Sequence, residues 1–370
     1  MTKEEHHLMA PAISRTARTS ALVGAVAALG LALSACSIAG GAAAPSGSAG
    51  TPGGTVTLVT HDSFALSDGL LDDFTERTGY RVEVVQPGDA GTLVNQLVLT
   101  KDAPLGDVVF GVDNTFASRA VDEGVVQPYT SAAPAAQDAA TYAADGGGAL
   151  TAVDYGDVCI NVDHAWFTEH DVPEPATLDD LTDPRYRDLL VVPSPVTSSP
   201  GFAFLLATVG AKGDAWPQYW EALKANGLKV AEGWSDAYST DFSGGGGGGP
   251  RPIVLSYASS PPFTVPEGGD EPTTGALLDT CFRQVEYAGV LAGASNVPGA
   301  QALVDFLLSD EVQADIPGSM YMYPVSSAVT LPQEWADWAP LAPQPFEVPA
   351  AQITEHREEW LAQWSQTVVG

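Results

Sequence analysis

The order of apolar patterns early in the chain constrains its fold more than any other feature of the sequence. β-rich runs alternate with amphipathic helical patterns, which predicts strands and helices in the order 55–60, 68–78, 80–85, 92–100 and 106–112. This β-α-β-α-β order predicts an α/β fold with a parallel, doubly wound sheet. Sheets of this kind bind their ligands at the carboxyl ends of the strands.

Three acidic residues lie where such a ligand would bind. Asp62, Asp89 and Asp113 each fall at or near the carboxyl end of a predicted strand, or in the loop after it. We therefore expect all three to lie near a bound ligand.

A second α/β unit follows. Its predicted elements are a strand, two helices and a second strand, at 189–192, 202–209, 216–226 and 253–255. Polar and aromatic residues crowd into two extended segments, 154–161 and 282–290, which we expect to cross between the units. Two units and two crossings predict two lobes with a ligand cleft between them, and such lobes close by hinge motion.

The domain order follows from these elements. Three helices are predicted near the C-terminus, at 302–308, 310–315 and 349–368. We expect a signal peptide at 1–35 and a flexible tether at 36–54. Lobe one is expected to begin at 55–157, lobe two to follow at 158–282, and the chain to return to lobe one with the C-terminal helices at 283–370.

The N-terminus has the pattern of a targeting segment. Arg15 and Arg18 precede an apolar stretch at 21–33, which is too short to span a bilayer. The stretch ends in Leu-Ser-Ala followed by Cys36, which resembles the lipobox of bacterial lipoproteins and predicts lipidation of Cys36 at the outer face of the cell membrane. A plain secretory signal with an incidental cysteine is the alternative.

The net charge indicates which partners the protein can bind, and the cysteine count indicates a disulfide. The formal net charge of −31 over 370 residues argues against nucleic acid, which requires a basic surface, and suits a soluble exported protein or a cationic ligand. Cys159 and Cys281 remain after Cys36. An even count in an exported chain predicts one disulfide, with two separate buried thiols as the alternative.

Residues 233–260 hold the most distinctive candidate site. Trp234 and Tyr257 lie at turns bordered by Gly, Ser and Pro, and Tyr257 ends an apolar strand. We expect both to contact a ligand, although packing at a domain boundary would also account for them. The six glycines at 244–249 are interpreted as a mobile surface connection.

One predicted helix start could bind an anion. Ser199 is the expected N-cap of the helix near 202–209, and Pro200 suits its first position. The free N–H groups there could hold a phosphate, although an ordinary capped helix would show the same pattern.

An ordered set of motifs resembles a known family, the substrate-binding proteins of bacterial thiamine ABC transporters within the family 1 extracellular solute-binding proteins. The resemblance rests on THDSFA (60–65), GDVVFGVDN (106–114), VDYG (153–156), TSSPG (197–201), GWSDAY (233–238), VLSYASSP (254–261), QVE (284–286) and IPG with MYPV (316–325). It implies a two-lobed type II periplasmic-binding-protein fold. It also implies that thiamine, or its phosphates, is held between the lobes and passed to an ABC permease and its ATPase. We expect the protein to be a monomer without cofactor or catalysis.

The resemblance also supplies candidate binding residues. Trp234, Tyr257, Asp89 and Ser198 match positions that line the family's cleft, whereas other aromatic positions depart from its pattern. His61 and Phe263 stand where Tyr is usual, and Tyr321 stands where Trp is usual. Aromatic faces and carboxylates suit a permanent cation such as the thiazolium ring. The full candidate set is His61, Asp62, Asp89, Asp113, Ser198, Ser199, Trp234, Tyr257, Phe263 and Tyr321.

Other functions compete with this interpretation. Tyr321 and Tyr323, two apart, could bind ferric iron with His61, and polyamine or phosphonate ligands suit the same kind of fold. A secreted hydrolase is the more distant alternative, because His61, Asp62 and Ser63 have the residue types of a catalytic triad. These three residues are consecutive, however, whereas triads are assembled from distant positions.

Overall fold

The computed structural model describes residues 53–144 and 147–370. The predicted signal peptide, Cys36 and nearly all of the predicted tether lie outside the described residues. Among the helices that are described, none is both long enough and apolar enough to cross a membrane.

The described chain forms one mixed sheet of ten strands. The strands are β1 (Gly54–Thr60), β2 (Tyr80–Val85), β3 (Val108–Asp113), β4 (Val126–Gln127), β5 (Thr151–Asp163), β6 (Leu190–Pro193), β7 (Lys229–Ala231), β8 (Ile253–Tyr257), β9 (Thr274–Leu291) and β10 (Tyr323–Pro324). The main order is β2-β1-β3-β9-β5-β8-β6-β7, with β4 paired to β9 and β10 paired to β5.

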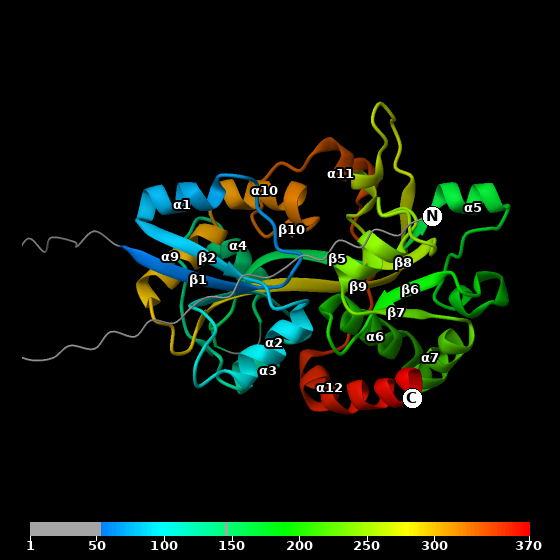
Figure 1. Cartoon of the computed structure of the whole chain (residues 1–370), viewed down its shortest axis with the longest axis horizontal. Coiled ribbons are helices and arrows are strands. Elements are labelled where there is room, and N and C mark those ends of the chain that lie inside the picture. The colour runs from blue at the N-terminus through cyan, green and yellow to red at the C-terminus, as the bar shows by residue number, and fades with distance from the viewer. Residues whose placement is uncertain (1–52, 145–146) are drawn as a thin grey trace, which may run out of the picture. The chain divides into compact units, whose positions relative to one another are not determined.

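The predicted parallel sheet is confirmed at both ends of this order but not in its middle. β2, β1 and β3 are parallel to one another, as are β8, β6 and β7. β9 runs antiparallel to both β3 and β5, and β5 runs antiparallel to β8. The two predicted crossing segments are therefore long antiparallel strands that join two parallel groups, because one carries the chain out and the other brings it back (Figure 1).

Helices flank both parallel groups. They are α1 (Leu70–Thr78), α2 (Ala90–Leu99), α3 (Ala117–Asp122), α4 (Ala136–Ala139), α5 (His164–His170), α6 (Ser199–Lys212), α7 (Trp216–Ala225), α8 (Trp234–Asp236), α9 (Val297–Leu307), α10 (Asp310–Met320), α11 (Gln333–Trp338) and α12 (Ala350–Trp364). Figure 1 shows α1, α9 and α10 beside β1 and β2, and α6 and α7 beside β6 and β7.

Several helix boundaries differ from the prediction, and two of them lie beside cavity-lining residues. Helix α6 is capped by Ser198, whose hydroxyl accepts the N–H of Gly201, so the predicted cap Ser199 is instead the first helical residue. Helix α10 continues through Pro317 to Met320, beyond the predicted range of 310–315. The helix then stops at Tyr321, which has a left-handed backbone with φ of 61°.

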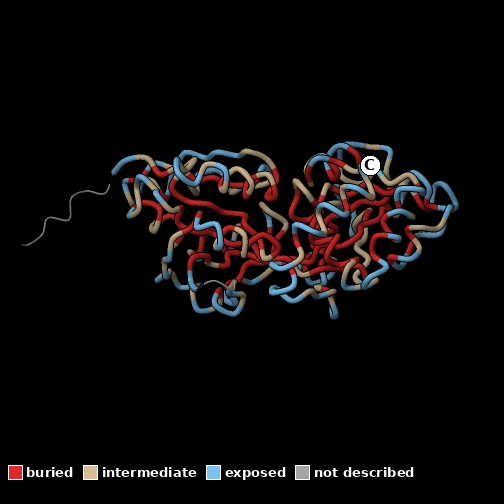
Figure 2. Tube along the Cα trace, turned by 90° about the horizontal axis from the view of Figure 1, so that it is seen from below, coloured by how far each residue is buried: buried red, intermediate tan, exposed pale blue. Residues whose placement is uncertain are grey.

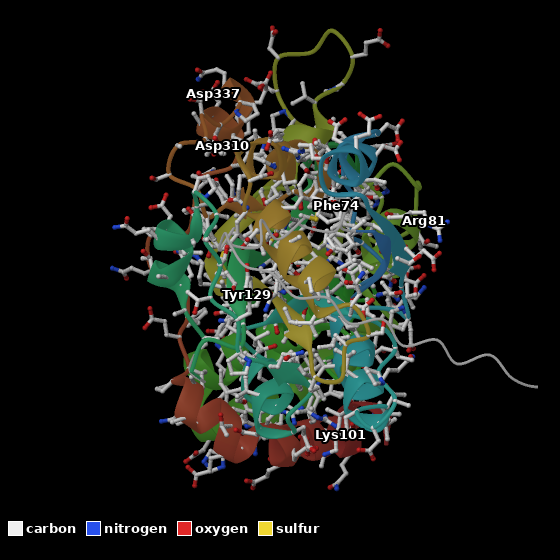
Figure 3. All side chains as sticks on the ribbon, turned by 90° about the vertical axis from the view of Figure 1, so that its left-hand side faces the viewer. Phe74, Arg81, Lys101, Tyr129, Asp310 and Asp337 are labelled. Carbon is white, nitrogen blue, oxygen red and sulfur yellow. A yellow bond between two sulfur atoms is a disulfide. The ribbon has the colours of Figure 1, made fainter. Side chains whose placement is uncertain are left out.

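The core runs through both parallel groups. Buried positions lie along the inside of the chain trace, and exposed positions lie at its periphery (Figure 2). Phe74 of α1 packs on Phe306 of α9 with ring centroids 5.1 Å apart, and Trp220 of α7 packs edge-on against Trp364 of α12. In Figure 3, Phe74 lies among the packed side chains while Arg81 projects at the edge of the molecule.

Cys159 of β5 and Cys281 of β9 form the predicted disulfide. Both residues are fully buried, so the bond fastens the two long antiparallel strands to each other inside the protein.

Candidate ligand-binding site

A cavity of about 250 Å³ opens where the two parallel groups meet. Its wall comes from the residues that follow β1, the starts of α2, α6 and α8, the end of β8 and the turn between α10 and β10. Six of the predicted residues line it together, namely His61, Asp89, Ser199, Trp234, Tyr257 and Tyr321. Such a volume suits a small organic molecule rather than a polymer.

Aromatic rings form one side of the cavity. Trp234 stacks on Tyr238 with centroids 5.0 Å apart and planes 11° apart. The rings of Tyr257 and Tyr321 lie 6.1 Å and 6.2 Å from Trp234. The indole N–H of Trp234 donates to Ser256 Oγ at 3.0 Å, which fixes the ring in its plane. These rings offer flat apolar surface together with the negative faces that attract cations.

A short hydrogen-bond chain fixes the deepest aromatic residue. The hydroxyl of Tyr257 donates to Gln284 Oε1 at 3.0 Å, and Gln284 Nε2 donates to Ser199 Oγ at 2.9 Å. Burial raises the pKa of Tyr257 well above its usual value, and the charges of Glu286 and Asp89 add to the shift. Tyr257 is therefore a neutral, pre-positioned ring.

Asp89 holds three helix starts together. Its carboxylate accepts N–H groups from Ala90 at 2.6 Å, Ser199 at 3.3 Å and Trp234 at 2.9 Å, which begin α2, α6 and α8. Burial raises the pKa of Asp89 above its usual value, against these hydrogen bonds, which lower it. A carboxylate in this place links elements of both parallel groups and positions the backbone of Trp234.

The start of α6 has no free donor for a phosphate. Ser199 N–H donates to Asp89, Pro200 has no N–H, Gly201 N–H donates to the Ser198 hydroxyl, and Phe202 N–H donates to the Ser198 carbonyl. The anion site expected at this helix start is thus already satisfied by the protein's own groups.

A buried ion pair lies on the wall of the cavity. His61 Nε2 is 3.4 Å from Glu286 Oε1, and the two side chains are 10% and 6% exposed. Burial alone would lower the pKa of His61, but Glu286, followed by Asp89 and Asp62, raises it above its usual value. His61 is therefore protonated more readily than a free imidazole, which suits it to pair with Glu286 as a cation.

Four predicted residues lie outside the cavity wall. Asp62 is exposed, and Ser198 is a buried helix cap. Asp113 is fully buried and accepts the N–H and hydroxyl of Thr115. Phe263 stacks behind Tyr321 with centroids 3.5 Å apart, so it supports a wall residue.

Three of the wall residues that were not anticipated as site residues are informative. Tyr238 lies one helical turn after Trp234 in the same motif, a spacing that could have marked it. Glu286 is the only acid in the predicted strand 282–290, and a lone acid in a buried strand is an unusual signal. Gly245 belongs to the glycine run that was interpreted as a mobile connection, and a Cβ there would overlap the carbonyl oxygen of Tyr238. Gly245 is therefore packed against the cavity wall, whereas Gly246, Gly247 and Gly248 are exposed, as a surface connection would be.

The arrangement does not support the iron or the hydrolase alternative. The Tyr323 hydroxyl donates to the carbonyl of Ala339, and its ring packs on Trp335, away from the Tyr321 ring. Among the described residues, no group of three or more His, Cys, Asp or Glu could hold a metal ion. His61 faces Glu286, whereas the Ser63 hydroxyl lies 3.0 Å from that of Ser235, so neither joins a triad.

The sequence profile of the bacterial extracellular solute-binding proteins matches residues 103–344. This chain belongs to that family. The match covers well over half of the chain, and it confirms the resemblance inferred from the motifs. The family binds solutes for transport and is not a family of enzymes.

Three known proteins resemble this solute-binding protein in sequence or in structure. The thiamine-binding periplasmic protein of Escherichia coli strain K12 is 27% identical over 318 residues, covering 85% of this chain and 93% of that protein. The solved structure of a periplasmic thiamin binding protein has a TM-score of 0.74 at 26% identity, covering 85% of this chain and 96% of that one. A ferric binding protein from Campylobacter jejuni shares the fold, with a TM-score of 0.67 at 15% identity, over 84% of this chain and 99% of that one. The predicted periplasmic-binding-protein fold is confirmed.

Proposed function

We propose that this solute-binding protein captures thiamine in the cavity and delivers it to the permease of an ABC transporter and its ATPase. The observation that carries the proposal is the pairing of aromatic faces with buried carboxylates on one cavity wall. Thiamine combines a flat aminopyrimidine with a permanently cationic thiazolium. Aromatic faces hold both rings, and a cation that cannot lose a proton is stabilised by nearby negative charge. The thiamine-binding names of the relatives support the same ligand.

The site favours thiamine without phosphate groups. The N–H groups at the start of α6 are engaged within the protein, so a phosphate would have to displace Asp89 or Ser198 from them. The wall also carries the negative charges of Asp89 and Glu286, which repel a phosphate. We expect thiamine to bind more tightly than thiamine pyrophosphate.

The proposal includes how the protein is held and how it moves. Lipidation at Cys36 would tether the monomer to the outer face of the cell membrane. Lobe one would comprise residues 55–157 and 283–370, and lobe two residues 158–282, with β5 and β9 as the crossings. Because Asp89 accepts N–H groups from both α6 and α8, closing the lobes would form these bonds and opening them would break them.

Titration calorimetry of the purified soluble body, residues 55–370, tests the ligand. The proposal predicts one thiamine site per chain and weaker binding of thiamine pyrophosphate. Equal or tighter binding of the pyrophosphate would overturn the preference for the unphosphorylated vitamin. Absence of any heat with thiamine, from protein whose far-ultraviolet circular dichroism shows a folded α/β chain, would overturn the proposed ligand itself.

A further inference from the structure

The middle of the sheet carries three buried carboxylates on neighbouring strands. Glu286 of β9 is the register partner of Asp113 on β3 and of Asp154 on β5. Residues directly opposed in antiparallel strands project to the same side of the sheet. Glu286 is 5% exposed, and the two aspartates are fully buried. Like charges opposed in this way destabilise a sheet, so the row calls for a functional reason.

The three acids of this row have few basic or hydrogen-bonding partners within the described part of the protein. The cationic group that faces this row of acids is the imidazole of His61, which lies beside Glu286. Arg283 on the same strand is paired with Asp157, and no Lys or Arg in the described part of the chain forms an ion pair with the three acids. Both oxygens of Asp154, and Oδ2 of Asp113, have no hydrogen-bond partner among the described residues. Burial raises the pKa of Asp113 to about 7 and the pKa of Asp154 well above its usual value, so both hold protons more readily than free aspartates. Glu286 is the member of the row that lines the cavity.

Asp89 is less suited to this role than Glu286. Its carboxylate accepts three backbone N–H groups, which spread and stabilise its charge. Glu286 Oε1 instead faces the imidazole of His61 across 3.4 Å, a partner that can lose its charge.

We propose that Glu286 selects a permanently cationic ring, with His61 acting as the internal cation that the ligand replaces. The inference rests on the proposed function and assigns the charge selectivity of that same site. When the cationic ring approaches Glu286, the imidazole of His61 gives up its proton to solvent, so the total charge beside Glu286 is maintained.

A matched pair of probes separates charge from shape. The probes are thiamine and a neutral isostere in which a thiophene ring replaces the thiazolium, both titrated by calorimetry. Wild-type protein is expected to bind thiamine on the order of 30-fold or more tightly than the isostere. Glu286→Gln should lose most of this affinity ratio, because it weakens the binding of thiamine and leaves that of the isostere unchanged. Glu359→Gln, an exposed acid on α12, makes the same change in net charge and should keep the wild-type ratio.

A second variant protects the test against a folding defect in Glu286→Gln. His61→Gln keeps a polar side chain but removes the internal cation, so thiamine affinity should rise about 3-fold or more at pH 6 and change little at pH 8. The isostere carries the same aminopyrimidine, so dividing by its affinity cancels the titration of that ring. Five other titratable groups face the pair from the surrounding elements: Asp62, Asp89, Asp113, Asp154 and Tyr257. Burial raises the pKa of Asp113 to about 7, so this group titrates between pH 6 and pH 8, and His61→Gln is therefore compared with wild type at each pH.

The outcomes distinguish this inference from the proposed function. Equal binding of thiamine and the isostere by wild-type protein overturns the inference and leaves thiamine as the ligand. An unchanged ratio in folded Glu286→Gln, or an unchanged pH dependence in His61→Gln, also overturns it. If wild-type protein binds neither probe, the proposed function and the inference both fail.

Discussion

At the scale of single residues, Trp234 joins the aromatic wall to the backbone that Asp89 holds. Trp234→Ala removes a ring that borders the cavity and exposes the stacked face of Tyr238. Its former partner Ser256 keeps a hydroxyl contact to Ser260 at 2.8 Å, so the fold loses little. We expect thiamine binding to weaken by on the order of 1–3 kcal/mol, measured by calorimetry.

Trp360→Ala provides the control for that measurement. Trp360 lies on α12 beside His356 and takes no part in the cavity. The two variants should therefore differ in affinity although each loses one indole. Equal affinities of the two variants for thiamine would mean that Trp234 has a purely structural role.

Asp113 makes the stability of the ligand-free protein depend on pH. Burial raises the pKa of Asp113 to about 7, against hydrogen bonds from Thr115, and the nearby charge of Glu286 adds to the shift. The folded protein thus keeps a proton that the unfolded chain loses at lower pH. Its contribution to stability is full below the ordinary aspartate pKa and is lost as pH rises through about 7.

Asp113→Asn should therefore stabilise the ligand-free protein at pH 8 by ~1–3 kcal/mol and have little effect at pH 5. The amide oxygen can still accept the hydrogen bonds of Thr115, and no charge remains to be buried. Urea unfolding at both pH values measures the difference. A variant that is less stable than wild type at pH 8 would contradict this account of the buried row.

At the scale of elements, alternate glycines of the run 244–249 pack against residues 238–241, and Gly245 borders the cavity. Cβ atoms at Gly245, Gly247 and Gly249 would each overlap backbone atoms of residues 238–241. Gly245→Ala should push Tyr238 out of its stacked position and weaken thiamine binding about 3-fold or more in a fluorescence titration.

Gly318→Ala is the matched control for that substitution. Gly318 lies on the exposed side of α10, where a Cβ would meet nothing within 4 Å. It should bind thiamine as wild type does. If Gly245→Ala also binds as wild type does, the run is only a connector after all.

Local patterns predicted the elements well and the site less completely. The strands and helices of the first unit follow from periodicity and from stop signals such as Gly79, whose φ is 78°. The cap of α6 was misplaced by one residue because Ser198 and Ser199 are equally good caps in sequence. Glu286 became a site residue only through pairing with β3 and β5, and a register between strands far apart in the chain is not visible in local spacing.

At the scale of the whole molecule, the disulfide fastens the two strands that connect the parallel groups. Cys159 and Cys281 are 122 residues apart, so their bond restricts a long loop in the unfolded chain. Replacing both cysteines with serine should lower the free energy of unfolding by on the order of 2–5 kcal/mol. Guanidinium unfolding measures the loss. No loss of stability would contradict a structural role for the bond.

The central claim is that the cavity takes thiamine and selects it for its permanent positive charge. Native mass spectrometry of the soluble body, mixed with equal amounts of thiamine, its neutral thiophene isostere and spermidine, tests this claim most directly. The account predicts a single adduct per chain with the mass of thiamine. A spectrum dominated by the isostere or spermidine adduct, or by folded protein without any adduct, would contradict it.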